Sequence, residues 1–140
     1  MKKINYIAGK SNYNNNAQWL PLKIHALDTA GMIKKLYDNW LANSVVEFIA
    51  KQLALSCDGE KAIERGRDFC ELVALLHDIG KLTPAFQSKI LKNIQGYADS
   101  LSDMGIIIST MGEVSKSHHA IAGQVIQEEY HFPKEISIII

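Results

Sequence analysis

The sequence has few residues that build cross-links through sulfur. Its 140 residues include two cysteines, Cys57 and Cys70, which stand thirteen positions apart. This spacing matches neither a zinc-binding cysteine pair nor a disulfide framework. Two isolated thiols are typical of a reducing compartment, so we expect a cytoplasmic location.

An excess of charge of either sign is also missing. Fifteen Lys and Arg residues are balanced by fifteen Asp and Glu residues, and the formal net charge at pH 7 is zero. The chain therefore has no global basic field of the kind that concentrates nucleic acid by charge alone. Any nucleic-acid binding would have to be local, through a groove or a bound cation.

Long hydrophobic runs are absent. The first ten residues, MKKINYIAGK, have a basic start, but their apolar part is too short for a signal peptide. No stretch approaches the roughly 20 apolar residues of a membrane-spanning helix, so we expect no membrane partner. With 47% hydrophobic residues the chain can still bury a core, and it shows no internal repeat. We expect residues 1–140 to form one domain.

Helical periodicity dominates the residues that are present, and we predict an all-α fold. Apolar side chains recur at steps of three and four, which indicates helices over residues 20–40, 45–55, 61–79, 85–94 and 117–130. Pro84 suits a first helical turn, and Gly80 suits a helix end. For the third helix we expect a buried face made of Ile63, Phe69, Leu72, Val73 and Leu76.

Three segments interrupt this pattern. Residues 10–18 are polar and rich in asparagine, which predicts a loop. Residues 96–117 are less regular, and a short strand and a buried turn both fit them. The end of the chain, KEISIII after Pro133, either tucks into the core or is an element interrupted midway, because exposed apolar ends invite association.

The dipeptide His77-Asp78 follows the apolar run ELVALL. A His-Asp pair is commonly a surface pair, but two unpaired polar groups beside such a run would be costly. Neighbours on a helix diverge by roughly 100°, so both side chains reach one cation only if it lies beyond the helix end. An imidazole and a carboxylate suit a divalent ion such as iron, manganese, cobalt or nickel. We therefore treat both residues as candidate metal ligands.

Other polar residues fit the same site. His25, in PLKIHALDT, is either a further ligand or a core histidine with a satisfied ring. His118 and His119 point in different directions, so we expect one to face the site. His119 is favoured because small residues follow it on one helix face. Lys81 could meet a substrate phosphate or remain solvated. Such a site would lower the pKa of a water molecule and hold a phosphate oxygen.

This pattern resembles the HD metal-dependent phosphohydrolase superfamily, with an upstream His, then His-Asp followed by Gly-Lys, then a later His. Three stretches, WLPLKIHALDTAG, LLHDIGKLTPAFQSKI and SHHAIAG, narrow the resemblance to the HD nuclease domain of the CRISPR-associated type I helicase-nuclease. The run HDIGKLTPAFQ is the most specific, since generic HD proteins rarely continue with TPAFQ. The resemblance covers most of residues 19–130.

The resemblance implies a helical bundle that holds one or two divalent transition-metal ions (Mn, Ni, Co or Fe) and cuts single-stranded DNA in antiviral defence. On the matching positions, it implies metal ligands at His25, His77, Asp78 and His119, with His118 as the alternative in register. It also implies catalytic roles for Asp78 and Lys81. The implied partners are single-stranded DNA, a helicase domain in the same or a partner chain, and the CRISPR interference (Cascade-type) complex.

The sequence departs from the family pattern in one respect. A second pair of histidines and a late ligand aspartate have no counterpart in the 140 residues. We therefore expect an N-terminal part of the domain that is weak or inactive by itself. Two other functions fit the same residues: an HD phosphohydrolase acting on nucleotides, and a catalytically incomplete binding module that docks on the interference complex or on another copy of itself.

Overall fold

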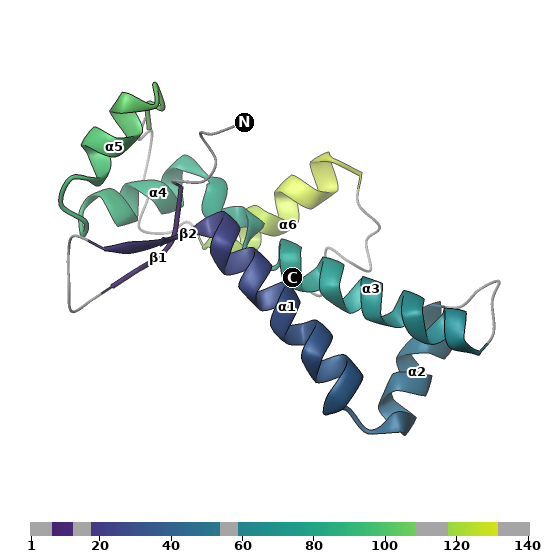
Figure 1. The fold of residues 1–140 in the computed structure, drawn as a ribbon. Helices are drawn as coiled ribbons and strands as arrows, with labels where there is room; N and C mark the ends of the chain where they lie inside the picture. The colour runs from purple at the N-terminus through teal and green to yellow at the C-terminus, as the bar shows by residue number, and fades with distance from the viewer. Residues whose placement is uncertain (1–6, 13–17, 54–58, 109–117, 132–140) are drawn as a thin grey trace. The chain divides into compact units, whose positions relative to one another are not determined.

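The computed structural model describes residues 7–12, 18–53, 59–108 and 118–131 (Figure 1). Within these ranges six α-helices dominate: α1 (Leu22–Asn39), α2 (Asn43–Leu53), α3 (Glu60–Leu76), α4 (Pro84–Leu91), α5 (Tyr97–Asp103) and α6 (His119–Glu129). The structure also has the short 3-10 helix η2 (Ile79–Leu82) and two strands, β1 (Ala8–Ser11) and β2 (Trp19–Pro21). The predicted all-α class is confirmed, with the small sheet as an addition. No helix in the described ranges is long and apolar enough to cross a membrane.

The two strands pair antiparallel, with Ala8 opposite Pro21 and Ser11 opposite Trp19. The loop predicted over residues 10–18 is therefore wrong at its first two positions, and residues 13–17 of that loop lie outside the described ranges. Because β2 continues to Pro21, the first helix begins at Leu22 instead of residue 20.

The chain divides into two compact units, one made of residues 1–26 and 76–140 and the other of residues 27–75. The core of the first unit gathers Tyr97 and Leu101 from α5 with Ile90, Ile94 and Ala8. Helix α5 was not predicted. A short strand or a buried turn was expected around GIIIST, where residues 106–108 form no strand and residues 109–110 lie outside the described ranges. The Ser and Asp residues of α5 are poor helix formers. The burial of Tyr97 and Leu101, one turn apart, explains why a helix forms there.

The second unit packs through small residues. On α3 the buried positions are Ala62, Gly66 and Ala74. The face predicted for this helix is wrong at Ile63 and Leu72, whose residues are 41% and 38% exposed. The hydroxyl of Tyr37 on α1 occupies the space that a side chain on Gly66 would fill, and it donates a hydrogen bond to the carbonyl of Ile63. Close packing on this face leaves no room for large side chains.

Helix α3 ends at Leu76, three residues earlier than predicted. His77 and Asp78 therefore lie on the turn that leads into η2. The turn is closed by the Lys81 N–H, which donates to the carbonyl of Asp78 at 2.9 Å, and by the Thr83 hydroxyl, which donates to the carbonyl of Gly80 at 2.7 Å. Pro84 opens α4 as predicted. Ser117 and the segment around Pro133 lie outside the described ranges.

Candidate metal centre

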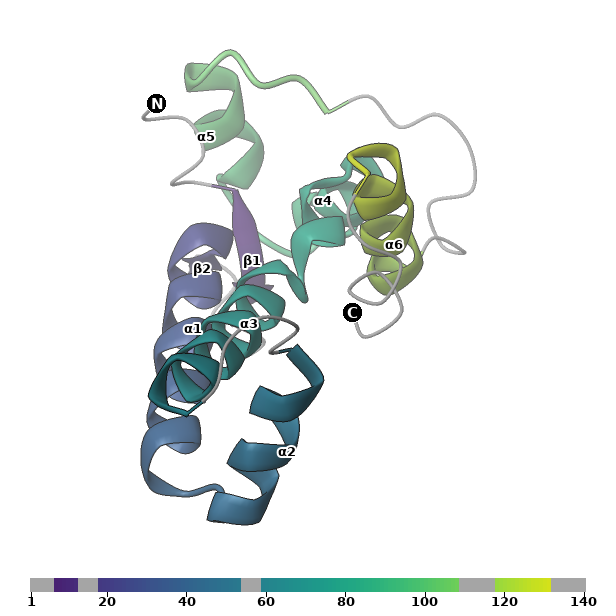
Figure 2. The same cartoon turned by 90° about the vertical axis from the view of Figure 1, so that its right-hand side faces the viewer.

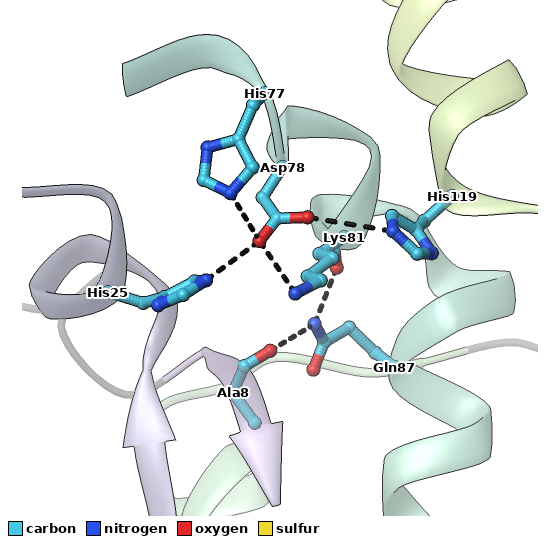
Figure 3. A network of polar contacts seen from close by, with 7 residues as sticks. All are labelled: Ala8, His25, His77, Asp78, Lys81, Gln87 and His119. Atoms are coloured by element: carbon cyan, nitrogen blue, oxygen red, sulfur yellow. Dashed lines mark hydrogen bonds and ion pairs between the residues drawn. The ribbon is translucent and has the colours of Figure 1, made fainter. Parts of the chain in front are cut away.

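Asp78 lies at the centre of a cluster of polar side chains (Figure 3). Its carboxylate Oδ2 lies 2.9 Å from Nε2 of His25, 3.0 Å from Nε2 of His77 and 2.6 Å from Nζ of Lys81. The other oxygen, Oδ1, faces Nε2 of His119 at 3.6 Å. The structure thus brings together side chains from α1, from the turn after α3, from η2 and from α6.

The turn explains how two sequence neighbours meet at one point. We placed both residues on a helix, where they would reach one cation only beyond the helix end, and this placement is wrong because α3 ends at Leu76. The backbone of Asp78 has φ −112° and ψ 14°, which is not helical. Its side chain consequently bends toward the ring of His77, and the rings of His77 and His25 meet edge to face at 5.6 Å.

Asp78 is ionised at neutral pH although it is only 6% exposed. Burial by itself raises the pKa of this carboxyl, since it penalises the charged form. The hydrogen bond and charge of Lys81, helped by His77 and His25, outweigh burial and lower the pKa below its ordinary value. The site therefore keeps a negative charge for a cation.

His119 has the protonation state that a metal ligand needs. Burial lowers the pKa of its ring, and the positive charges of Lys81, His118 and Lys89 lower it further, against the opposing effect of Asp78. A pKa below 6.5 leaves the imidazole neutral at pH 7, so a ring nitrogen has a free lone pair.

The structure also separates the two adjacent histidines. His119 is the first residue of α6, and its ring packs edge to face on Phe86 with centroids 5.5 Å apart. His118 precedes the helix with an extended backbone and is exposed. Of the two, His119 is the one placed against Asp78.

This difference predicts unequal effects of two matched substitutions. His119→Ala should weaken Mn²⁺ binding by at least about 10-fold, because it removes a neutral imidazole from the cluster. His118→Ala should have a much smaller effect, because its exposed ring stacks on the ring of His119 at 6.3 Å but does not face Asp78. Isothermal titration of both variants measures the difference. Equal losses in the two variants would contradict this assignment.

Backbone packing brings α6 to the site, and α6 lies beside α4 (Figure 2). A Cβ on Gly80 would collide with the carbonyl of His119 and would lie 2.5 Å from the nitrogen of Gly123. Gly80 was expected to end a helix, but its role is to let two backbones touch. This contact sets His119 beside Asp78.

The donor set fits a divalent transition metal. His25, His77 and Asp78 each offer a ligand atom, and these atoms lie within 4.8 Å of one another. Two imidazoles and one carboxylate are the mixture that suits iron, manganese, cobalt, nickel or zinc. His119 adds a neutral third imidazole at the edge of the group.

Sequence reasoning missed the residues that support this cluster. Phe86 lies against the ring of His119, and the ammonium of Lys81 lies 5.7 Å from the centroid of the Phe86 ring. Gln87, the next residue, is buried and bonds to the backbone of η2. Both belong to the run TPAFQ, which was singled out as distinctive without a physical role. The available signal in the sequence was that TPAFQ directly follows HDIGKL, which carries the candidate ligands.

The comparisons with known proteins agree with this geometry. The family model described as "Cas3, HD domain" matches residues 9–138. The chain is 32% identical over 155 residues to the CRISPR-associated nuclease/helicase Cas3 of Streptococcus thermophilus, covering 100% of this chain and 16% of that protein. The chain therefore spans about one sixth of the length of this curated relative. No solved structure matches it significantly. With its helical bundle and its His-Asp centre, the chain belongs to the Cas3 HD-domain family.

Proposed function

We propose that this chain is the metal-binding part of a nuclease that cleaves single-stranded DNA in CRISPR interference. The observation that carries the proposal is the convergence of His25, His77 and His119 on the carboxylate of Asp78 in a member of this family. We further propose that residues 1–140 belong to one domain of this kind, working in the cytoplasm.

In this proposal His25, His77 and Asp78 hold a divalent ion, with His119 as a further ligand. Such an ion, when bound, lowers the pKa of water and withdraws charge from a phosphate oxygen. Asp78 supplies the negative charge that retains the cation. The neutral ring of His119 binds metal without first losing a proton.

Lys81 is proposed to have two tasks. Its ammonium donates to Oδ2 of Asp78 at 2.6 Å and so fixes the rotation of the carboxylate. An ammonium carries three N–H donors, so Lys81 can hold Asp78 and still donate to a phosphate oxygen. Its side chain is 13% exposed, and we propose that a phosphate oxygen reaches the ammonium from this exposed part.

The substrate and partners follow from the family and from the charge balance. The curated relative is named a nuclease/helicase, and this chain covers 16% of it. Because the chain itself has zero net charge, it lacks a field that would gather DNA. We propose that a helicase, in the same or a partner chain, delivers single-stranded DNA to the site, and that the interference complex recruits both.

Cleavage of circular single-stranded DNA by the purified chain with Mn²⁺, Co²⁺ or Ni²⁺ tests this function. We expect slow, metal-dependent linearisation that EDTA stops. The rate should be low because the described donors suffice for one ion, whereas two ions would stabilise both reacting oxygens. Asp78→Asn serves as the control for contaminating nucleases.

Parallel assays with duplex DNA and with nucleoside triphosphates separate the proposed function from its alternative. Faster hydrolysis of nucleotides than of DNA would favour a nucleotide phosphohydrolase and would refute the nuclease proposal. Failure to bind any of the three metals in a titration would refute the metal centre itself.

A further inference from the structure

Gln87 is a buried polar side chain that takes no direct part in the proposed metal site. It is 2% exposed, and both its amide nitrogen and its amide oxygen have hydrogen-bond partners. Its amide nitrogen donates to the carbonyl of Ala8 at 2.9 Å and to the carbonyl of Lys81 at 2.5 Å (Figure 3). An amide nitrogen carries two hydrogens, so both are used.

The carbonyl of Lys81 belongs to the segment that presents the carboxylate of Asp78. Lys81 lies in η2, three residues after Asp78, and its side chain contacts the same oxygen of Asp78 as His25 and His77 do. Gln87 therefore holds the backbone of the short turn that carries both charged groups. A four-residue 3-10 helix has few hydrogen bonds of its own, so an external donor matters for its position.

The carbonyl of Ala8 belongs to a segment that is hydrogen-bonded to the start of the helix of His25. Ala8 follows Ile7, and the carbonyl of Ile7 accepts a hydrogen bond from the N–H of Leu22 at 2.6 Å. Leu22 is the first residue of α1, and His25 follows within its first turn. The amide of Gln87 thus joins the turn that carries Asp78 to the segment that is hydrogen-bonded to the start of the helix of His25.

Tyr97 fixes the orientation of this amide. Its hydroxyl accepts from the N–H of Ala8 at 2.8 Å and donates to Oε1 of Gln87 at 2.5 Å. Because Oε1 faces this hydroxyl, the nitrogen end of the amide must face the two carbonyls. Tyr97 is itself fully buried in the core, so the arrangement has a rigid base.

We propose that Gln87 is a positioning residue whose amide sets the spacing between His25 and Asp78 and thereby the affinity of the site for a divalent metal. The proposal rests on the proposed function insofar as that spacing serves a metal. Its physical basis is independent, because the hydrogen bonds of Gln87 exist between backbone atoms and require no ion.

Gln87→Met tests the proposal, because methionine fills a similar volume and donates no hydrogen bond. Co²⁺ binding, followed by its visible absorption, should weaken about 10-fold, as for other residues that orient metal ligands. The absorption spectrum of the bound Co²⁺ should also change shape, since altered ligand spacing alters the coordination geometry. A purely structural role would lower the unfolding midpoint and leave this spectrum unchanged.

Ser88→Ala is the matched control. Ser88 is the next residue, is 3% exposed, and donates one hydrogen bond to the carbonyl of Pro84 within its own helix. The Ser88→Ala variant should be less stable than the wild type but should bind Co²⁺ with unchanged affinity and an unchanged absorption spectrum. Should Gln87→Met fail to fold, Tyr97→Phe removes one hydroxyl and frees the amide to rotate, and it should weaken Co²⁺ binding in the same direction.

A measurement without metal separates this proposal from the proposed function. The N–H of Lys81, which closes the turn by donating to Asp78, should exchange with solvent deuterium about 10-fold faster in Gln87→Met than in the wild type, relative to amides of α2. Unchanged exchange together with unchanged Co²⁺ binding would overturn the positioning role. A wild-type chain that binds no metal would refute the proposed function, while the exchange result would still decide whether Gln87 holds the turn.

Discussion

Asp78→Asn is expected to abolish metal binding, with an affinity loss of at least about 100-fold. Asparagine has the same shape but no negative charge, and the carboxylate is the one anionic group in the cluster of described ligand atoms. Titration with Mn²⁺ measures the loss. Asp38→Asn, which removes a partly exposed ion pair with Arg67 at 3.5 Å, should leave metal affinity unchanged and provides the control.

Asp78→Asn should also destabilise the chain by about 3 kcal/mol at pH 7, because it leaves the largely buried ammonium of Lys81 without its anionic partner. The pKa of Asp78 is lower in the folded chain than its ordinary value of 3.8. Its stabilising contribution is therefore present above pH 3.8 and is lost as the pH falls through the folded value. Urea unfolding of wild type and variant should differ at pH 7 and converge in acid. A difference that persists unchanged in acid would refute this explanation.

Gly80→Ala is expected to cause the largest loss of stability among the glycine substitutions, about 3 kcal/mol or more, since overpacking against backbone has no flexible atom to yield. The new methyl group would overlap the carbonyl of His119 and push α6 away from η2. His119 would move from Asp78, so metal affinity should fall as well. Urea denaturation and Mn²⁺ titration together measure both effects.

Two other glycines provide a graded comparison. A Cβ on Gly123 would lie 3.3 Å from the nitrogen of Gly80, so Gly123→Ala should cost less. Gly31 lies in the middle of α1 with nothing within 4 Å of an added Cβ, and Gly31→Ala should stabilise by about 0.5–1 kcal/mol through helix propensity. A Gly80→Ala variant as stable as the wild type would show that the backbones do not touch in solution.

The residues of the candidate site could be proposed from the sequence, and the structure brings His25, His77 and Asp78 within 4.8 Å of one another. His77 and Asp78 are polar residues that directly follow the apolar run ELVALL. Polar groups in such a place need partners, which indicates a binding role. The position of His25, 53 residues away from Asp78, followed from the family resemblance. The preference for His119 over His118 came from the small residues that follow it, and Gly123 packs on Gly80 as such residues allow.

The support of the site could not be read in the same way. The hydrogen bond between Gln87 and Ala8 joins residues 79 positions apart, and no local sequence pattern around either residue predicts this contact. Strand β1 has four residues, too few for a periodic signal. Its position depends on partners in α4 and α5, which become visible only when the chain is folded.

Burial was predicted least well where small residues do the packing. Ile63 and Leu72 were assigned to the core because of their hydropathy, yet α3 buries Ala62, Gly66 and Ala74 instead. Hydrophobic periodicity gives most weight to large apolar residues. A helix face made of Ala and Gly, which allows close approach, therefore gives a weak hydrophobic signal in the sequence. The same effect concealed the role of Gly80.

Direct contact between the backbones of η2 and α6 also limits how the chain can diverge. Where side chains interlock, a bulky replacement on one element is readily rescued by a smaller residue on its neighbour. At Gly80 the opposing atoms are the main-chain carbonyl of His119 and the main-chain nitrogen of Gly123, which are common to every amino acid. A second substitution that rescues a larger residue there would have to move the whole of α6. We therefore expect almost no residue other than glycine to be tolerated at this position.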